Sequence, residues 1–125
     1  MLIAYEVALD LVRALRPVVA QLRSYSPDAA DQVERAASSI VLNLAEGGRR
    51  HGRDPRRFWD IAHGSAGEIR GALDLADAWG WQVESGPARA LLDRELGLLW
   101  GLTRRTRSKA TPEQAASAPN ARPSR

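Results

Sequence analysis

Residues 28–47, DAADQVERAASSIVLNLAEG, are the stretch that decides the fold. Apolar and small residues recur in it at spacings of three and four, which is the pattern of one buried helix face. The residues of this stripe are Val33, Ala36, Ala37, Ile40, Leu44 and Gly47. The pair Gly47-Gly48 predicts where the helix ends, since glycine is common just after a helix.

The same helix carries a second group of small or apolar residues, roughly 100–200° around its axis from Ile40. This group contains Ser38, Val41, Leu42 and Ala45. A helix that is apolar on two sides has to bury both of them. We therefore predict an oligomer interface at Val41, Leu42 and Ala45; the alternative is cover by the first helix or by the end of the chain.

Polar residues beside the stripe predict a buried network. Ser39, Asn43 and Glu46 lie on one flank of this helix, and Ser65 and Glu68 lie on or beside the apolar face of a later helix. An unpaired buried polar group costs on the order of 1–3 kcal/mol, so these side chains should bond to one another. A structural network that fixes helix register is the simpler interpretation, and a functional site is the alternative.

Three further helices are predicted outward from this stretch. The first runs from about Leu2 to Arg23, with a kink expected at Pro17, and a turn at 24–28 follows it. Asp54-Pro55 should begin the third helix, which ends near Trp79-Gly80, and Ser85-Gly86-Pro87 should open the fourth, which continues to about Arg107. In the fourth helix the residues expected to face inward are Ala88, Leu92, Leu96, Leu99 and Thr103.

Four helices of similar length with short links predict an all-α protein, an antiparallel up-down-up-down four-helix bundle. This domain should span residues 1–107. Residues 108–125 are rich in Ala, Pro, Ser and basic side chains, and we expect a disordered basic tail there.

The composition limits the number of domains and the cellular location of the protein. The chain has 125 residues, which suits one domain, and no cysteine. Its first residues do not resemble a signal peptide, and no window approaches the ~18 consecutive apolar residues of a membrane span. We expect a cytoplasmic protein that does not enter membranes.

The net charge of +3 is unevenly distributed. Residues 49–57 hold five Arg against Asp54, and residues 104–125 hold six Lys or Arg against Glu113. The remaining segments carry more acidic than basic residues. Clustered charge of this kind says more about partners than the total does.

No enzyme motif is complete. The two histidines are His51 and His63, and Asp60 with His63 is a single acid-x-x-His pair, whereas a di-metal bundle needs two such pairs and two more inward carboxylates. His63-Gly64-Ser65-Ala66-Gly67 lacks the glycine that a nucleophile elbow has two residues before its serine. We therefore predict no catalytic residues, no metal and no cofactor.

The strongest functional signal is the cluster of Arg49, Arg50, Arg53, Arg56 and Arg57. Arginine binds phosphate in a bidentate way that ignores sequence, so the cluster predicts nucleic-acid binding. Trp59, placed about 120° from the core stripe, is expected to be exposed enough to stack on a base. The alternative is a solvated loop whose arginines pair with acidic helices.

Two segments together resemble a known family. They are 35–50, RAASSIVLNLAEGGRR, and 58–68, FWDIAHGSAGE. Both are similar to the four-helix-bundle proteins called 23S rRNA intervening-sequence proteins, with the pattern R-A-x-x-S-I-P-x-N-I-A-E-G-x-x-R followed by F-L-x-I-A-x-G-S-x-x-E-L. The similarity extends over about 5–105. Val41 stands where the family usually has proline, which implies a straighter second helix, and Trp59 replaces a common leucine.

The resemblance implies an antiparallel bundle that assembles into a ring, typically a homopentamer, with no settled activity. A related bundle, the accessory variability protein of diversity-generating retroelements, forms a similar ring and binds nucleic acid and a reverse transcriptase. Two functions follow as expectations. One is a ring-forming accessory protein that binds RNA or DNA and a reverse transcriptase; the other is a protein-interaction scaffold that binds no nucleic acid.

Overall fold

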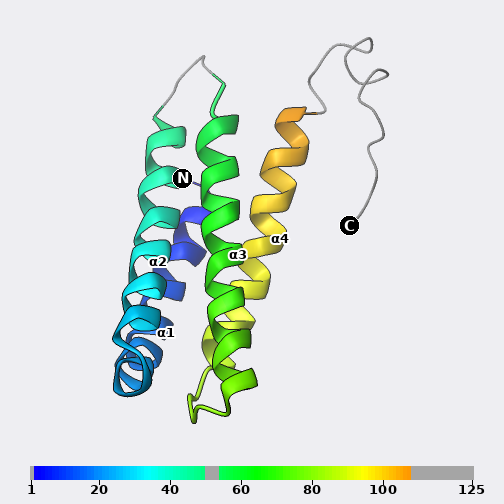
Figure 1. Ribbon diagram of the computed structural model, residues 1–125. Helices are drawn as coiled ribbons and strands as arrows, with labels where there is room; N and C mark the ends of the chain where they lie inside the picture. The colour runs from blue at the N-terminus through cyan, green and yellow to red at the C-terminus, as the bar shows by residue number, and fades with distance from the viewer. Residues whose placement is uncertain (1, 50–53, 108–125) are drawn as a thin grey trace.

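Four helices pack side by side in the computed structural model (Figure 1), which describes residues 2–49 and 54–107, with side chains as far as Arg104. They are α1 (Ile3–Tyr25), α2 (Pro27–Gly48), α3 (Arg56–Trp79) and α4 (Gly86–Arg107). Figure 1 shows consecutive helices running in opposite directions. The all-α four-helix bundle predicted from the sequence is confirmed.

Each helix packs against the next one along the chain, and α4 packs back against α1. The buried stripe of α2 is the one predicted, with Ala30 added at its start. The largest side chains in the common core are leucines, isoleucines and valines from all four helices. The bundle is therefore held mainly by apolar burial, at about 25 cal/mol for each Å² removed from water.

The link between α1 and α2 is a single residue. Ser26 lies between the helices, and its Oγ accepts a hydrogen bond from the Ala29 backbone N–H at 3.1 Å, which caps α2. Pro27 follows at the first helical position, where its missing N–H does no harm. The predicted turn at 24–28 was therefore too long, because both helices extend into it.

The link between α3 and α4 is fixed against the end of α1. Gly80 ends α3 with φ of 79°, a left-handed conformation that glycine adopts readily. Trp81 then stacks on Tyr25, with ring centroids 5.5 Å apart, and the Gln82 backbone N–H donates to the Tyr25 hydroxyl at 3.0 Å. These contacts close the end of the bundle opposite the 49–55 link.

Pro17 lies inside α1 on its exposed side, and the helix continues past it to Tyr25. The kink expected there stays a prediction. The predicted tail at 108–125 and the loop residues 50–53 lie outside the described residues. Among the described helices, none is long and apolar enough to cross a membrane.

Candidate nucleic-acid interface

One end of the bundle gathers arginines from three helix ends. α2 ends at Gly48, α3 begins at Arg56 and α4 ends at Arg107, and Figure 1 shows these ends on the same side of the molecule. The arginines with described side chains there are Arg49, Arg56, Arg57 and Arg104. The fold thus brings together two basic runs that are far apart in the sequence.

Two arginines of the 49–57 segment, Arg49 and Arg56, pair with acids close to them in the chain. Arg49 lies 3.7 Å from Glu46, and Arg56 lies 2.6 Å from Asp54. Asp54 also accepts a hydrogen bond from the Arg56 backbone N–H at 2.9 Å. This backbone bond first, and then the Arg56 side chain, hold the pKa of Asp54 below its usual value.

Such exposed pairs contribute little to stability, typically about 0–1 kcal/mol, so phosphate could replace them at small cost. Arg57 is exposed, and it forms no ion pair with any other described residue. Arg50 and Arg53, predicted for the same interface, lie outside the described residues.

The opposite end of the bundle has more acidic than basic side chains. Its two arginines are each held by two carboxylates: Arg23 lies 2.8 Å from Asp31 and 3.5 Å from Glu34, and Arg89 lies 3.1 Å from Asp74 and 2.9 Å from Asp77. Asp28 and Glu84 add further negative charge there. The bundle therefore has one end suited to anions and one that repels them.

Trp59 is not the exposed aromatic residue that the sequence suggested. It is 5% exposed, and its indole packs directly under Gly47, where an added Cβ would overlap the ring. The buried face of α3 is centred nearer Ala62 and Ala66 than Ser65, while Ile61 is exposed. The expected 120° offset was therefore measured from the wrong centre, and Trp59 cannot stack on a base.

Trp100 is the exposed aromatic residue at the basic end, and sequence reasoning did not single it out. It is 49% exposed, the Arg104 guanidinium carbon lies 5.4 Å from its ring centroid, and the His63 ring lies 6.3 Å away at 38°. The spacing of four residues between Trp100 and Arg104 could have revealed the pair, because such residues share a helix face.

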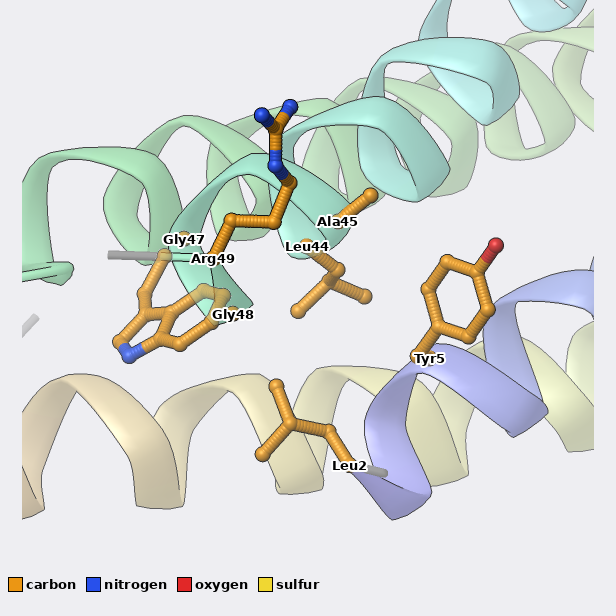
Figure 2. Close-up of a pocket in the computed structure, with 8 residues that line it drawn as sticks. Leu2, Tyr5, Leu44, Ala45, Gly47, Gly48 and Arg49 are labelled. Carbon is orange, nitrogen blue, oxygen red and sulfur yellow. The ribbon is translucent and has the colours of Figure 1, made fainter. Parts of the chain in front are cut away.

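A hollow of about 790 Å³ opens between the start of α1 and the last turn of α2. Figure 2 shows Leu2, just before α1, and Tyr5 of α1 facing Leu44 of α2 across it, with the Arg49 side chain extending away from Leu2. The remaining lining residues are Ala45, Gly47, Gly48 and Trp59. The walls are mostly apolar with one arginine at the rim, so the hollow suits an apolar group better than a phosphate.

Three of the predicted network residues are joined at the α2–α3 contact. The Ser65 hydroxyl donates to the Ser39 hydroxyl at 2.9 Å, and the Asn43 amide donates to the Ser39 hydroxyl at 3.1 Å and to its carbonyl at 2.9 Å. Glu46 is half-buried and pairs with Arg49. Glu68 is exposed, so its predicted burial was wrong: it lies on the α3 face turned away from the core.

The predicted oligomer interface is exposed only in part. Leu42 is 66% exposed, while Val41 and Ala45 are half-buried and Val41 packs against the core. On the neighbouring helix, Ile61 and Leu75 are also exposed. A second copy or another protein remains a proposal for this face.

Glu95 is a buried acidic side chain that sequence reasoning missed. It lies on α4 with 0% of its surface exposed, and neither carboxyl oxygen has a hydrogen-bond partner within the described part of the chain. Burial raises the pKa of Glu95 to about 8, which the positive charge of Arg94 partly opposes. The described residues contain no group of three potential metal ligands.

Comparison with known proteins identifies the family. Residues 1–85 match the family described as 23S rRNA-intervening sequence protein, so this chain belongs to that family. The match contains α1, α2, α3 and most of the link that follows, and it stops just before α4 begins. Searches of curated proteins and of solved structures found no match.

Proposed function

We propose that this protein is a non-enzymatic, ring-forming accessory protein that binds nucleic acid, RNA first of all, through the basic end of its bundle. The observation that carries the proposal is the meeting of Arg49, Arg56, Arg57 and Arg104 at one end, with acidic residues concentrated at the other. A polyanion is attracted to such an end and repelled by the opposite one.

The arginines predicted to contact phosphate are Arg49, Arg50, Arg53, Arg56 and Arg57. Ring symmetry would repeat this set once in every subunit, which would give one face of the ring a strong positive potential. A homopentamer and a reverse transcriptase partner rest on likeness to related bundles, and fold alone does not fix function.

The test is the affinity for a fluorescent single-stranded RNA and a duplex DNA over a salt series. The logarithm of affinity should fall linearly with the logarithm of salt, and the slope counts the phosphates neutralised. Changing Arg49, Arg56 and Arg57 together to Gln should abolish tight binding. The matched control changes Arg13, Arg16 and Arg70, which are exposed elsewhere on the bundle, to Gln and should bind as the native protein does.

If neither RNA nor DNA binds at low salt, or if both triple variants bind equally well, the proposal fails. Light scattering on the purified protein measures the mass of the assembly and so the number of subunits in the ring. Co-purification with a reverse transcriptase tests that partner.

The second candidate is a protein-interaction scaffold without nucleic-acid binding. It is favoured by the exposed apolar side chains Leu42, Ile61 and Leu75 on α2 and α3. Exposed apolar side chains on neighbouring helices can mark an interface. Loss of a protein partner on changing Leu42 to Ser, together with no RNA binding by the native protein, would favour the scaffold.

A further inference from the structure

Trp100 is an aromatic side chain left half in water at the basic end of the bundle. A tryptophan usually buries its large ring in a core or an interface, so a ring 49% exposed is one available for contact. It lies seven residues before α4 ends at Arg107, or about 10 Å along the helix. The ring is therefore within reach of a strand bound across the arginines at this end.

The surface near Trp100 has a glycine on each of the two helices. Gly97 lies one turn before it on α4, and Gly67 lies one turn after His63 on α3. An added Cβ at either glycine would meet nothing within 4 Å. No side chain at these two positions therefore hinders a planar group from approaching the ring.

The immediate neighbours of the ring are planar groups that nucleic acids also contact. The Arg104 guanidinium lies over the ring at 5.4 Å from its centroid, and the His63 ring borders it. A cation–π contact at an exposed site is weak, so the guanidinium can exchange its place over the ring for a phosphate. A base can then stack on the indole while Arg104 holds the adjoining backbone.

We propose that Trp100, with Arg104 and His63, forms a stacking platform for an unpaired base of single-stranded nucleic acid. This rests on the proposed function, and it goes further by naming the strand state that the site selects. In a duplex both faces of a base are covered by its neighbours, whereas a single strand can present them to an aromatic side chain. The arginines alone would not distinguish the two forms in this way.

The test compares a labelled single-stranded RNA of about 12 nucleotides with a duplex of the same sequence. We expect Trp100→Ala to weaken single-strand binding roughly 10-fold while duplex binding and the salt slope stay unchanged. Trp100→Phe should keep most of the affinity because it keeps a stacking face.

The matched control is Trp79→Ala. Trp79 is 68% exposed, but it ends α3 at the acidic end of the bundle, so its loss should not change binding. Circular dichroism of each variant checks that the bundle is folded, and Trp100→Phe keeps the test valid if the alanine variant unfolds.

The outcomes separate the two proposals. If the native protein binds neither nucleic acid, the proposed function fails and the platform with it. If the native protein binds and Trp100→Ala binds the single strand equally well, only the platform is overturned. If Trp100→Ala changes the mass of the assembly measured by light scattering, Trp100 is a contact between copies, which also overturns the platform.

Discussion

The α2–α3 contact and α4 differ in whether their inward-facing polar side chains are hydrogen-bonded. At the α2–α3 contact, Asn43 of α2 and Ser65 of α3 both donate hydrogen bonds to Ser39. On α4, Glu95 is fully buried with no partner among the described residues. The family match includes α2 and α3 and excludes α4. A satisfied network specifies register, whereas an unsatisfied carboxyl lowers stability and makes it depend on pH.

The largest expected effect is at Glu95. Glu95→Met keeps a similar volume and removes the unpaired carboxyl, so it should stabilise the bundle by about 3 kcal/mol at neutral pH. Denaturant unfolding of the two proteins measures the difference. A loss of stability would mean that Glu95 has a partner, and the contrast with the α2–α3 contact would disappear.

The same residue predicts a pH dependence. The folded protein binds the Glu95 proton more tightly than the unfolded chain does, with a pKa of about 8 against 4.5. The stability that this proton gives is fully present below pH 4.5 and is lost as pH rises from there through pH 8. Unfolding of Glu95→Gln across this range should lack that decline, and an unchanged decline would assign it to other groups.

A smaller effect, this time a loss of stability, is expected at Gly47. An alanine there would overlap the Trp59 indole, so Gly47→Ala should destabilise the bundle by about 2–3 kcal/mol. Gly48→Ala is the matched control, because its Cβ would meet nothing within 4 Å, and it should be neutral or slightly stabilising. Equal thermal midpoints for the two variants would show that Trp59 moves aside easily.

The next smaller effect is expected in the hydrogen-bond network of Ser39, Asn43 and Ser65. Asn43→Ala removes the amide that donates to the Ser39 hydroxyl and carbonyl, and it should cost about 1–2 kcal/mol. Chemical denaturation measures this cost. A change near zero would mean that the α2–α3 hydrogen bonds add no stability, and the two regions would then differ less than their geometry indicates.

The smallest effect is expected at Glu68. This residue was predicted from the sequence to join the network but is exposed, so Glu68→Ala should change the unfolding free energy by less than about 0.5 kcal/mol. Asn43→Ala and Glu68→Ala therefore form a pair. Similar costs for both would place Glu68 in the network after all.

Most of the fold could be predicted from helix periodicity alone. The stripe from Val33 to Gly47 was predicted correctly because it depends only on the spacing of residues along one helix. The Ser39, Asn43 and Ser65 hydrogen bonds followed from the same stripe, since polar residues at its edge need partners when two helices meet. Arg50 and Arg53 lie outside the described residues, and their predicted role stays a prediction.

Residues at the edges of stripes could not be placed in this way. Glu95 and Leu96 lie on opposite sides of the α4 stripe, about equally far from its centre, and a small rotation of the helix decides which is buried. The bundle buries Glu95 and leaves Leu96 half-buried. Trp59 was misjudged for the same reason, because the space under Gly47 accommodates its indole and residue spacing along one helix does not show that space.

The sequence by itself determined the class of fold, the number of helices and the main apolar faces, because each is a property of local spacing along the chain. The tertiary structure alone decided which edge residues are buried and which distant residues meet. Arg49 and Arg104 lie at one end only because consecutive helices run in opposite directions. Rotation of each helix about its axis is set by packing against its neighbours, and no single helix contains that information.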